Sequence, residues 1–250
     1  MSLGEIVAIA AAGLAAGMIN TVVGSGTLIT FPVLLAFGYA PVTANVSNTI
    51  GLVPGSVSGA IGYRRELSGQ RGRAIRLGAA SLLGGITGAV LLLALPAAAF
   101  AAIVPVFIAL ALVLIVLQPR LNSLLAKHVG HTDHSGPVLL LTLYATGVYG
   151  GYFGAAQGIL LLGILGLALR QDLHRTNALK NVLAGLVNGV AGVFFIFAAH
   201  VEWAPAAIIA CSSIVGAQIG ARYGRRLNPV ALRALIVAVG IAAIVHFVVG

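Results

Sequence analysis

Long apolar runs, separated by short polar or glycine-rich stretches, make up most of the chain. They cover about residues 4–37, 41–63, 74–95, 97–117, 138–170, 173–199, 204–222 and 229–249. Most of these runs are close to the ~20 residues that a helix needs to cross the hydrocarbon core of a bilayer. The pattern therefore predicts an all-α integral membrane protein with about eight transmembrane segments.

The first and fifth runs are too long for a single crossing. Each is interrupted by small and polar residues, Gly24-Ser25-Gly26-Thr27 in the first and Gly154-Ala155-Ala156-Gln157-Gly158 in the fifth. Irregular backbone at membrane depth is tolerated only where it is buried in protein or lines a cavity. We therefore predict that each of these two runs forms a broken helix or a helical hairpin.

The two halves of the chain repeat each other at a constant offset of 132 positions. This offset predicts an internal duplication, with a first transmembrane repeat over 1–120, a cytoplasmic linker over 121–137 and a second repeat over 138–250. The matched positions include the glycine breaks, two polar stripes and two small-residue packing motifs: Gly26 with Gly158, Asn45 with Asn177, Asn48 with Lys180, Thr49 with Asn181, Ser56 with Asn188, and Gly84 and Gly88 with Gly216 and Gly220.

Composition agrees with a chain that lies mostly in lipid. Hydrophobic residues make up 60% and charged residues 8% of the 250 positions, and the mean hydropathy is +1.08, whereas a soluble domain carries about 25% charged residues. The net charge of +9 does not predict nucleic-acid binding, because the arginines lie between apolar runs. Cys211 stands alone, so we predict no disulfide within the chain and interpret this residue as part of the helix packing.

The positions of the basic residues predict how the halves are oriented. Lysine and arginine lie between runs two and three, in the central linker, between runs five and six, and between runs seven and eight. Basic loops of membrane proteins are cytoplasmic, and all of these loops can be cytoplasmic only if each long run enters and returns. The two halves are then inverted repeats, and both termini are periplasmic.

A polar stripe in the sixth run is the strongest candidate for function. Asn177, Lys180 and Asn181 are three and four residues apart, so a helix places them on one face. If Asp172 caps this helix, Lys180 lies ~12 Å along its axis, near the middle of a ~30 Å hydrocarbon core. A lysine at that depth indicates a functional site, with snorkelling toward the cytoplasmic surface as the alternative.

The first half carries the matching stripe, Asn45, Asn48 and Thr49, on a helix that we expect to begin at Pro41. In an inverted arrangement the two stripes approach the midplane from opposite sides, where inverted-repeat transporters bind their substrates. Hydrogen bonding between packed helices is the alternative role for these amide side chains.

The glycine breaks supply a second set of candidates. A break exposes a helix N-terminus, whose free N–H groups favour an anion. Ser25, Thr27 and Gln157 can add neutral donors, and we expect Gly26 and Gly158 to allow close approach of the backbone. A kink made only for packing is the alternative.

No cluster of residues predicts a metal site, a cofactor or a catalysed reaction. His128, His131 and His134 lie in the polar linker, and we interpret them as solvated residues rather than zinc ligands. The acidic residues lie near the ends of runs or in loops, which favours an anionic or neutral substrate over a cation. A rhomboid-type protease would need Gly-x-Ser-Gly, but Val23 stands in place of the first glycine, so we predict no enzyme.

The glycine breaks, the duplicated halves and the segments Ala44-Asn45-Val46-Ser47-Asn48 and Thr176-Asn177-Ala178-Leu179-Lys180-Asn181 resemble the TauE/SafE sulfite exporter family over nearly the whole chain. The resemblance implies a multi-pass protein of the bacterial inner membrane that transports small sulfur-containing anions such as sulfite, sulfonates and related organic acids. The family often has three consecutive glycines at each break. Here Ser25 and Thr27 flank Gly26, and Gln157 precedes Gly158, which leaves the particular substrate open.

We therefore predict a membrane transporter that moves a small sulfur-containing anion by alternating access. We expect the protein to interact with its anionic substrate and with the lipid bilayer, and we expect no cofactor, no metal and no nucleic-acid partner. An anion channel or a non-transporting scaffold subunit is the alternative, and assembly into a homo-oligomer stays open. The predicted substrate-binding residues are Ser25, Gly26, Thr27, Asn45, Asn48, Thr49, Gln157, Gly158, Asn177, Lys180 and Asn181.

Overall fold

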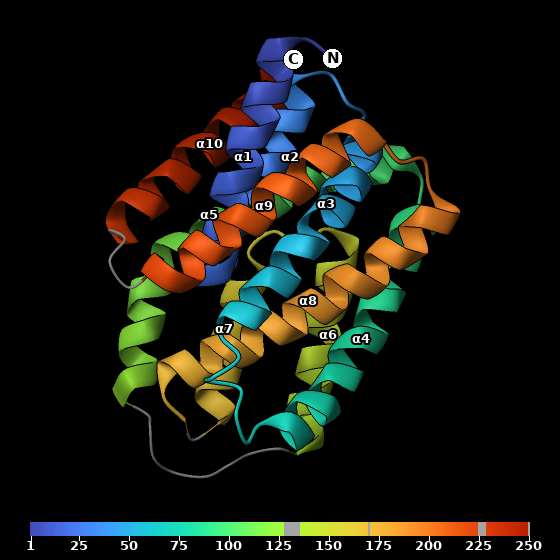
Figure 1. Cartoon of the computed structure of the whole chain (residues 1–250). Helices are drawn as coiled ribbons and strands as arrows, with labels where there is room; N and C mark the ends of the chain where they lie inside the picture. The colour runs from blue at the N-terminus through green and yellow to red at the C-terminus, as the bar shows by residue number, and fades with distance from the viewer. Residues whose placement is uncertain (128–135, 170, 225–228, 250) are drawn as a thin grey trace.

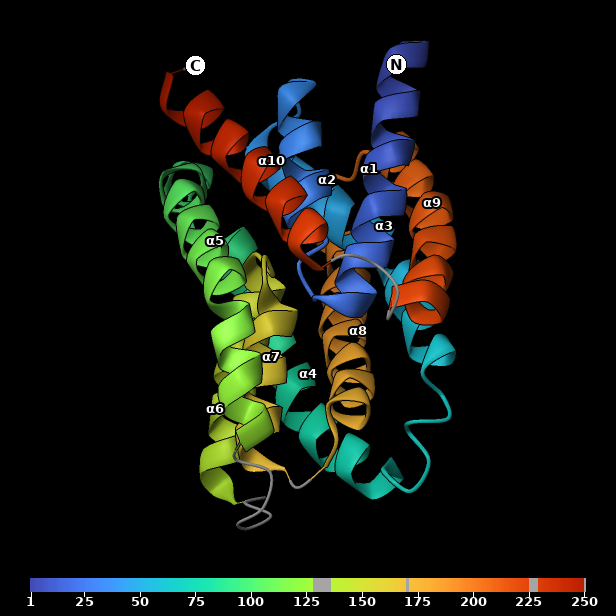
Figure 2. The same ribbon diagram turned by 90° about the vertical axis from the view of Figure 1, so that its left-hand side faces the viewer.

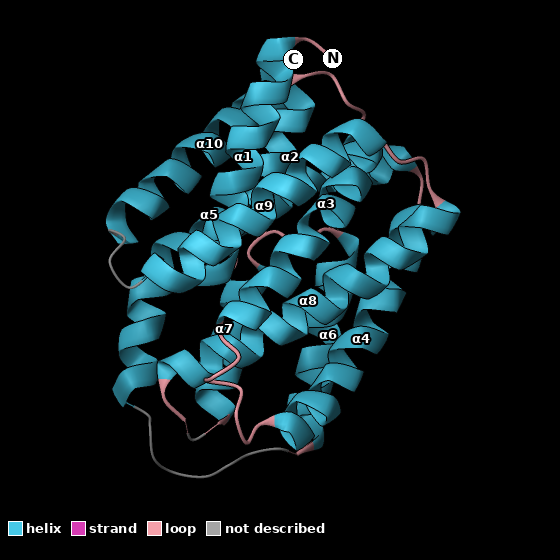
Figure 3. Ribbon diagram, viewed as in Figure 1, coloured by secondary structure: helices cyan, strands magenta, loops and turns pink. Residues whose placement is uncertain are grey.

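The computed structural model describes residues 1–127, 136–169, 171–224 and 229–249, which form ten helices and no strand (Figures 1 and 3). The prediction of an all-α protein is confirmed. Five of the described helices, α1, α4, α5, α8 and α9, are long and apolar enough to cross a membrane. The ten helices are α1 (Leu3–Val22), α2 (Thr27–Ala36), α3 (Pro41–Gly62), α4 (Arg71–Ala94), α5 (Ala97–Lys127), α6 (Pro137–Tyr152), α7 (Gln157–Ala168), α8 (Leu173–Ala198), α9 (Trp203–Tyr223) and α10 (Pro229–Val249).

The helices that carry the polar stripes begin where the local sequence predicts. The carboxylate of Asp172 accepts hydrogen bonds from the backbone amides of His174 and Arg175, at 2.9 and 3.0 Å, and so caps α8. Pro41 lies in the first turn of α3, where a missing N–H group is harmless. These two starts set the depth of the polar residues that follow.

Both long apolar runs form helical hairpins. The first turns back between α1 and α2, and the fifth turns back between α6 and α7. Gly24 and Gly154 have φ angles of 93° and 76° in these turns, a conformation that glycine adopts without strain. Because α2 has 10 residues, it is only ~15 Å long, about half the ~30 Å thickness of the hydrocarbon core.

The two halves are inverted copies of each other. Helices α1 to α5 correspond in order to α6 to α10, and α1 packs on α9 as α6 packs on α4. The start of α1 and the end of α10 lie at one end of the molecule, whereas α5 ends and α6 begins at the opposite end (Figures 1 and 2). The starts of α4 and α8, near which arginines gather, also lie at that opposite end.

The repeated small-residue motifs make the closest contacts between the halves. A Cβ atom added to Gly84 would lie 2.1 Å from the carbonyl oxygen of Tyr144 in α6. One added to Gly216 would lie 2.0 Å from the carbonyl oxygen of Leu14 in α1. These two matched positions therefore have the same structural role. Each lets a helix of one half pack directly against the backbone of a helix of the other half.

Two details differ from the predictions. Helix α5 continues to Lys127, so the connection between the halves starts later than residue 121; the three linker histidines lie outside the described residues. Cys211 is exposed on α9 and is not part of the core. In a membrane protein an apolar helix face can point to lipid as readily as to protein, so an apolar run alone does not place a small residue inside.

Candidate functional site

The tips of the two hairpins meet in the middle of the molecule. Figure 2 shows both tips, blue and yellow, at about half its height. The amide of Gly158 donates a hydrogen bond to the carbonyl oxygen of Gly24 at 3.0 Å. A Cβ atom on either glycine would lie 2.4 Å from the Cα atom of the other. Gly158 thus makes the close backbone approach expected of it, and its partner in the first half is Gly24. Gly26 also approaches backbone closely, but within its own hairpin, because its added Cβ atom would lie 2.5 Å from the carbonyl oxygen of Ala16 in α1.

Unpaired donors lie at both hairpin tips, most of them at the start of α2. Within the described part of the chain, the backbone amides of Ser25, Gly26 and Thr27 donate no hydrogen bond. The hydroxyl of Ser25 and the amide nitrogen Nε2 of Gln157 are also buried without a partner. Ser25 and Gln157 occupy matching positions of the two repeats and are only 1% and 3% exposed. Buried polar groups are nearly always paired, so these atoms mark a place for a ligand or water.

The start of α7 is less open than the start of α2. The amide of Gln157 donates to the carbonyl oxygen of Gly154 at 3.2 Å, and the amide of Gly158 is taken by Gly24. Ala156, just before α7, has a positive φ of 58°, which is unusual for a residue with a Cβ atom. The two hairpin tips are therefore related by the repeat but offer different numbers of free donors.

Asn45 and Asn177 each hold the hairpin of the opposite half. The Nδ2 atom of Asn177 donates to the carbonyl oxygen of Thr21 at 3.2 Å, and that of Asn45 donates to Tyr152 at 3.0 Å. These carbonyls lie at the ends of α1 and α6, where they have no partner within their own helix. The Oδ1 atoms of both asparagines are buried and unpartnered.

Lys180 lies fully inside the protein and does not snorkel. Its side chain is 0% exposed, and Nζ donates to the carbonyl oxygens of Asn20 and Thr21 at 3.1 and 3.3 Å. Nδ2 of Asn181 also donates to Thr21, at 3.3 Å. The ammonium therefore faces the negative end of the α1 dipole. Burying a lysine at the centre of a membrane costs roughly 2.5–3.5 kcal/mol on insertion scales, and these contacts offset part of that cost.

Asn48, the counterpart of Lys180, has different partners. The hydroxyl of Thr30 donates to its Oδ1 atom, and its Nδ2 atom lies 3.5 Å from the hydroxyl of Thr27. Thr49 donates to the carbonyl oxygen of Asn45 at 2.8 Å within α3. The structure thus attaches the first stripe to α2 and α6, and the second stripe to α1. The two stripes therefore bind different groups.

Two further amides, from α1 and α8, meet at Ser56, where α3 packs on α8. Nδ2 of Asn188 and Nδ2 of Asn20 both lie 3.5 Å from the hydroxyl of Ser56. Because Ser56 and Asn188 are matched positions, this contact lies on the axis that relates the repeats. Asn20 and Thr30 are absent from the predicted site. The sequence did carry a signal for both residues. Each is a polar residue in the first apolar run, Asn20 just before the glycine break and Thr30 just after it.

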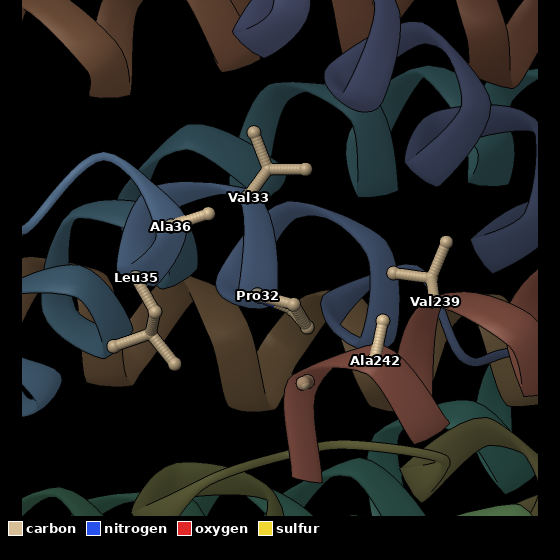
Figure 4. Close-up of a pocket in the computed structure, with 7 residues that line it drawn as sticks. Pro32, Val33, Leu35, Ala36, Val239 and Ala242 are labelled. Atoms are coloured by element: carbon tan, nitrogen blue, oxygen red, sulfur yellow. The ribbon is translucent and has the colours of Figure 1, made fainter. Parts of the chain in front are cut away.

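The apolar pocket between α2 and α10 does not belong to this site. It has a volume of about 220 Å³ and is lined by Pro32, Val33, Leu35, Ala36, Val239, Ala242 and Ala243. Figure 4 shows these side chains, which carry no polar atom. A site of this kind cannot replace the hydration shell of an anion.

Comparison with known proteins identifies the family. The chain matches the family "Sulfite exporter TauE/SafE" over residues 9–247, and it therefore belongs to that family. It is 30% identical over 229 residues to "Probable membrane transporter protein ORF9" of Sinorhizobium sp, covering 91% of this chain and 86% of that protein. It is 27% identical over 213 residues to "Probable membrane transporter protein YfcA" of Escherichia coli (strain K12), covering 85% and 76%. No solved structure matches the chain.

Proposed function

We propose that this TauE/SafE family member transports a small sulfur-containing anion, such as sulfite, a sulfonate or a related organic anion, by alternating access across the bacterial inner membrane. Family membership and the names of the relatives establish the coarser statement that the chain is a multi-pass membrane transporter. The description of the family supports sulfite-like anions as the substrate class.

The unpaired donors at the two touching hairpin tips are the observation that carries this proposal. Three backbone amides, the hydroxyl of Ser25 and Nε2 of Gln157 lie beside the touching hairpin tips without acceptors. A helix N-terminus combines free N–H groups with the positive end of the helix dipole. An oxyanion with several oxygens would accept hydrogen bonds from these groups in place of water.

The distribution of charge also favours an anion. Among the described residues, Glu5, Glu66, Asp172 and Glu202 lie in loops, at a cap or in the first turn of a helix, and none lies near the hairpin tips. Lys180 is the one charged residue among the buried side chains of the described part of the chain, and it lies beside the end of α1. A cation would meet no counter-charge here.

Inverted repeats supply a physical basis for alternating access. Two halves of one fold in opposite orientations can exchange conformations, so that a site facing one side of the membrane becomes a site facing the other. The end of the molecule near the starts of α4 and α8 would be cytoplasmic by the positive-inside rule. Both termini would then be periplasmic.

Uptake into proteoliposomes tests the proposal. We expect saturable uptake of radiolabelled sulfite or methanesulfonate by the wild type, and at least tenfold slower uptake by Ser25→Ala and Gln157→Leu, because each removes a donor from the hairpin tips. Thr142→Val is a matched control, since Thr142 is half-buried and its hydroxyl donates to the carbonyl oxygen of Val138 within α6. Uptake that rises linearly with concentration would favour a channel, and no uptake of any sulfur anion would favour a scaffold.

A further inference from the structure

Three side-chain donors of α8 converge on one carbonyl oxygen at the end of α1. The oxygen of Thr21 accepts from Asn177, Lys180 and Asn181 at 3.2, 3.3 and 3.3 Å. A carbonyl oxygen has two lone pairs, so it cannot satisfy three donors well. The ammonium, which has three N–H bonds, also reaches Asn20 at 3.1 Å. The cluster thus offers more hydrogen-bond donors than the end of the helix can use.

The hairpin of the second half, α6 and α7, is held by fewer and uncharged donors. There, among the described residues, the facing helix α3 supplies one neutral donor to the end of α6, Nδ2 of Asn45 on the carbonyl oxygen of Tyr152, and the hydroxyl of Tyr149 donates to the carbonyl oxygen of Ala155 within the tip. Asn48, which matches Lys180, is engaged with Thr27 and Thr30 of α2. One amide from the facing helix, with one hydroxyl inside the hairpin, therefore holds the equivalent end without any charge. Capping alone does not explain why α8 adds a buried positive charge and a second amide.

We propose that Asn177, Lys180 and Asn181 form a second, state-dependent anion site, which the carbonyl oxygen of Thr21 occupies in this conformation. The inference rests on the proposed transport of an anion. The end of α1 carries partial negative charge and stands in the position that an oxyanion would take. When α1 withdraws, the transported anion replaces it on the three donors. Anion binding here and at the start of α2 would then belong to different steps of the transport cycle.

In this conformation the end of α1 lies against α3, and an engineered disulfide between the two helices can hold it there. A Cβ atom added to Gly59 of α3 would lie 3.6 Å from the Cβ atom of Thr21, within the usual range of about 3.5–4.5 Å for a disulfide. Thr21→Cys with Gly59→Cys, in a Cys211→Ser background, should therefore crosslink on oxidation. The bond would hold the end of α1 against α3, beside the donors of α8.

The first test measures transport by this double variant in proteoliposomes before and after oxidation. Methanesulfonate is the probe, because sulfite itself cleaves disulfides. We expect oxidation to slow uptake at least tenfold and a reductant to restore it, whereas each single-cysteine variant is unaffected by oxidation. An oxidised double variant that transports as fast as its reduced form would overturn the inference, since α1 would not need to leave the donors. Absence of uptake by both the reduced variant and the wild type would instead contradict the proposed function.

The second test separates the charge from the cap. Lys180→Gln retains an N–H donor for the carbonyl oxygens of α1 but removes the positive charge. If the three donors receive an anion, this variant remains folded, as judged by a single peak in size-exclusion chromatography, yet takes up sulfite at least tenfold more slowly. Uptake at the wild-type rate would show that Lys180 only caps α1, which overturns the inference without affecting the site at α2.

Discussion

Gly158→Ala probes the contact that joins the two hairpins. The new Cβ atom would lie 2.4 Å from the Cα atom of Gly24 and 2.9 Å from its carbonyl oxygen, whereas carbon atoms pack best at about 3.5–4.0 Å. Both near atoms are backbone, so the tips must separate by more than about 1 Å. Overpacking of this kind costs about 1–3 kcal/mol. Separation also breaks the hydrogen bond between Gly158 and Gly24, worth about 1 kcal/mol. We therefore expect a loss of about 2–4 kcal/mol in the free energy of unfolding.

Gly163→Ala is the matched control, because it makes the same chemical change in the same helix where no atom lies within 4 Å. Alanine is a better helix former than glycine, so this control should be neutral or up to about 1 kcal/mol more stable. Equilibrium unfolding in mixed micelles, followed by circular dichroism, measures both variants. We expect Gly158→Ala also to abolish transport. Equal unfolding midpoints for the two variants would refute the idea that the hairpin tips are held in backbone contact.

Three further predictions concern single side chains. Asp172→Ala should lower the free energy of unfolding by about 1 kcal/mol, because α8 loses its N-cap; denaturant titration in mixed micelles checks this, and an unchanged midpoint contradicts it. Tyr39→Phe should cost about 1 kcal/mol by removing the 2.7 Å hydrogen bond to Glu5. Burial and the hydrogen bond to Glu5 raise the pKa of Tyr39 to about 12. The stability lost in Tyr39→Phe should therefore be the same at neutral and mildly alkaline pH and should disappear only as the pH rises toward 12. A stability difference between wild type and variant that changes below pH ~9 would contradict this prediction. Lys180→Met should change stability by less than about 2 kcal/mol, because the lost hydrogen bonds and the relieved burial of charge have opposite signs; a larger thermal destabilisation would mean that capping α1 is the main role of this lysine.

Most of the fold could be predicted from the sequence, because it depends on local rules. Apolar runs predict where the helices lie, and glycine with polar neighbours marks the breaks at residues 24–26 and 154–156. Asp172 and Pro41 mark the starts of α8 and α3. The offset between the halves predicts which helices correspond, and the inverted arrangement follows from the loop arginines.

The partners of the site residues could not be predicted in the same way. Lys180 and Asn48 occupy matched positions on matched helices, yet one bonds to the end of α1 and the other to α2. That difference arises from tertiary packing, since a lysine reaches further than an asparagine and carries charge that only carbonyl groups balance here. The exposure of Cys211 was missed for a related reason, because hydrophobicity does not distinguish a lipid-facing helix surface from a buried one.

Counterflow in proteoliposomes tests the central claim most directly. Vesicles containing the purified protein are loaded with unlabelled sulfite and diluted into a trace of radiolabelled sulfite. A transporter with alternating access exchanges internal for external anion, so we expect a transient accumulation of label above equilibrium that is absent from empty vesicles and from Ser25→Ala. Label that enters without this overshoot would indicate a channel. Vesicles that accumulate no label with sulfite, methanesulfonate or any related sulfur anion would contradict the account.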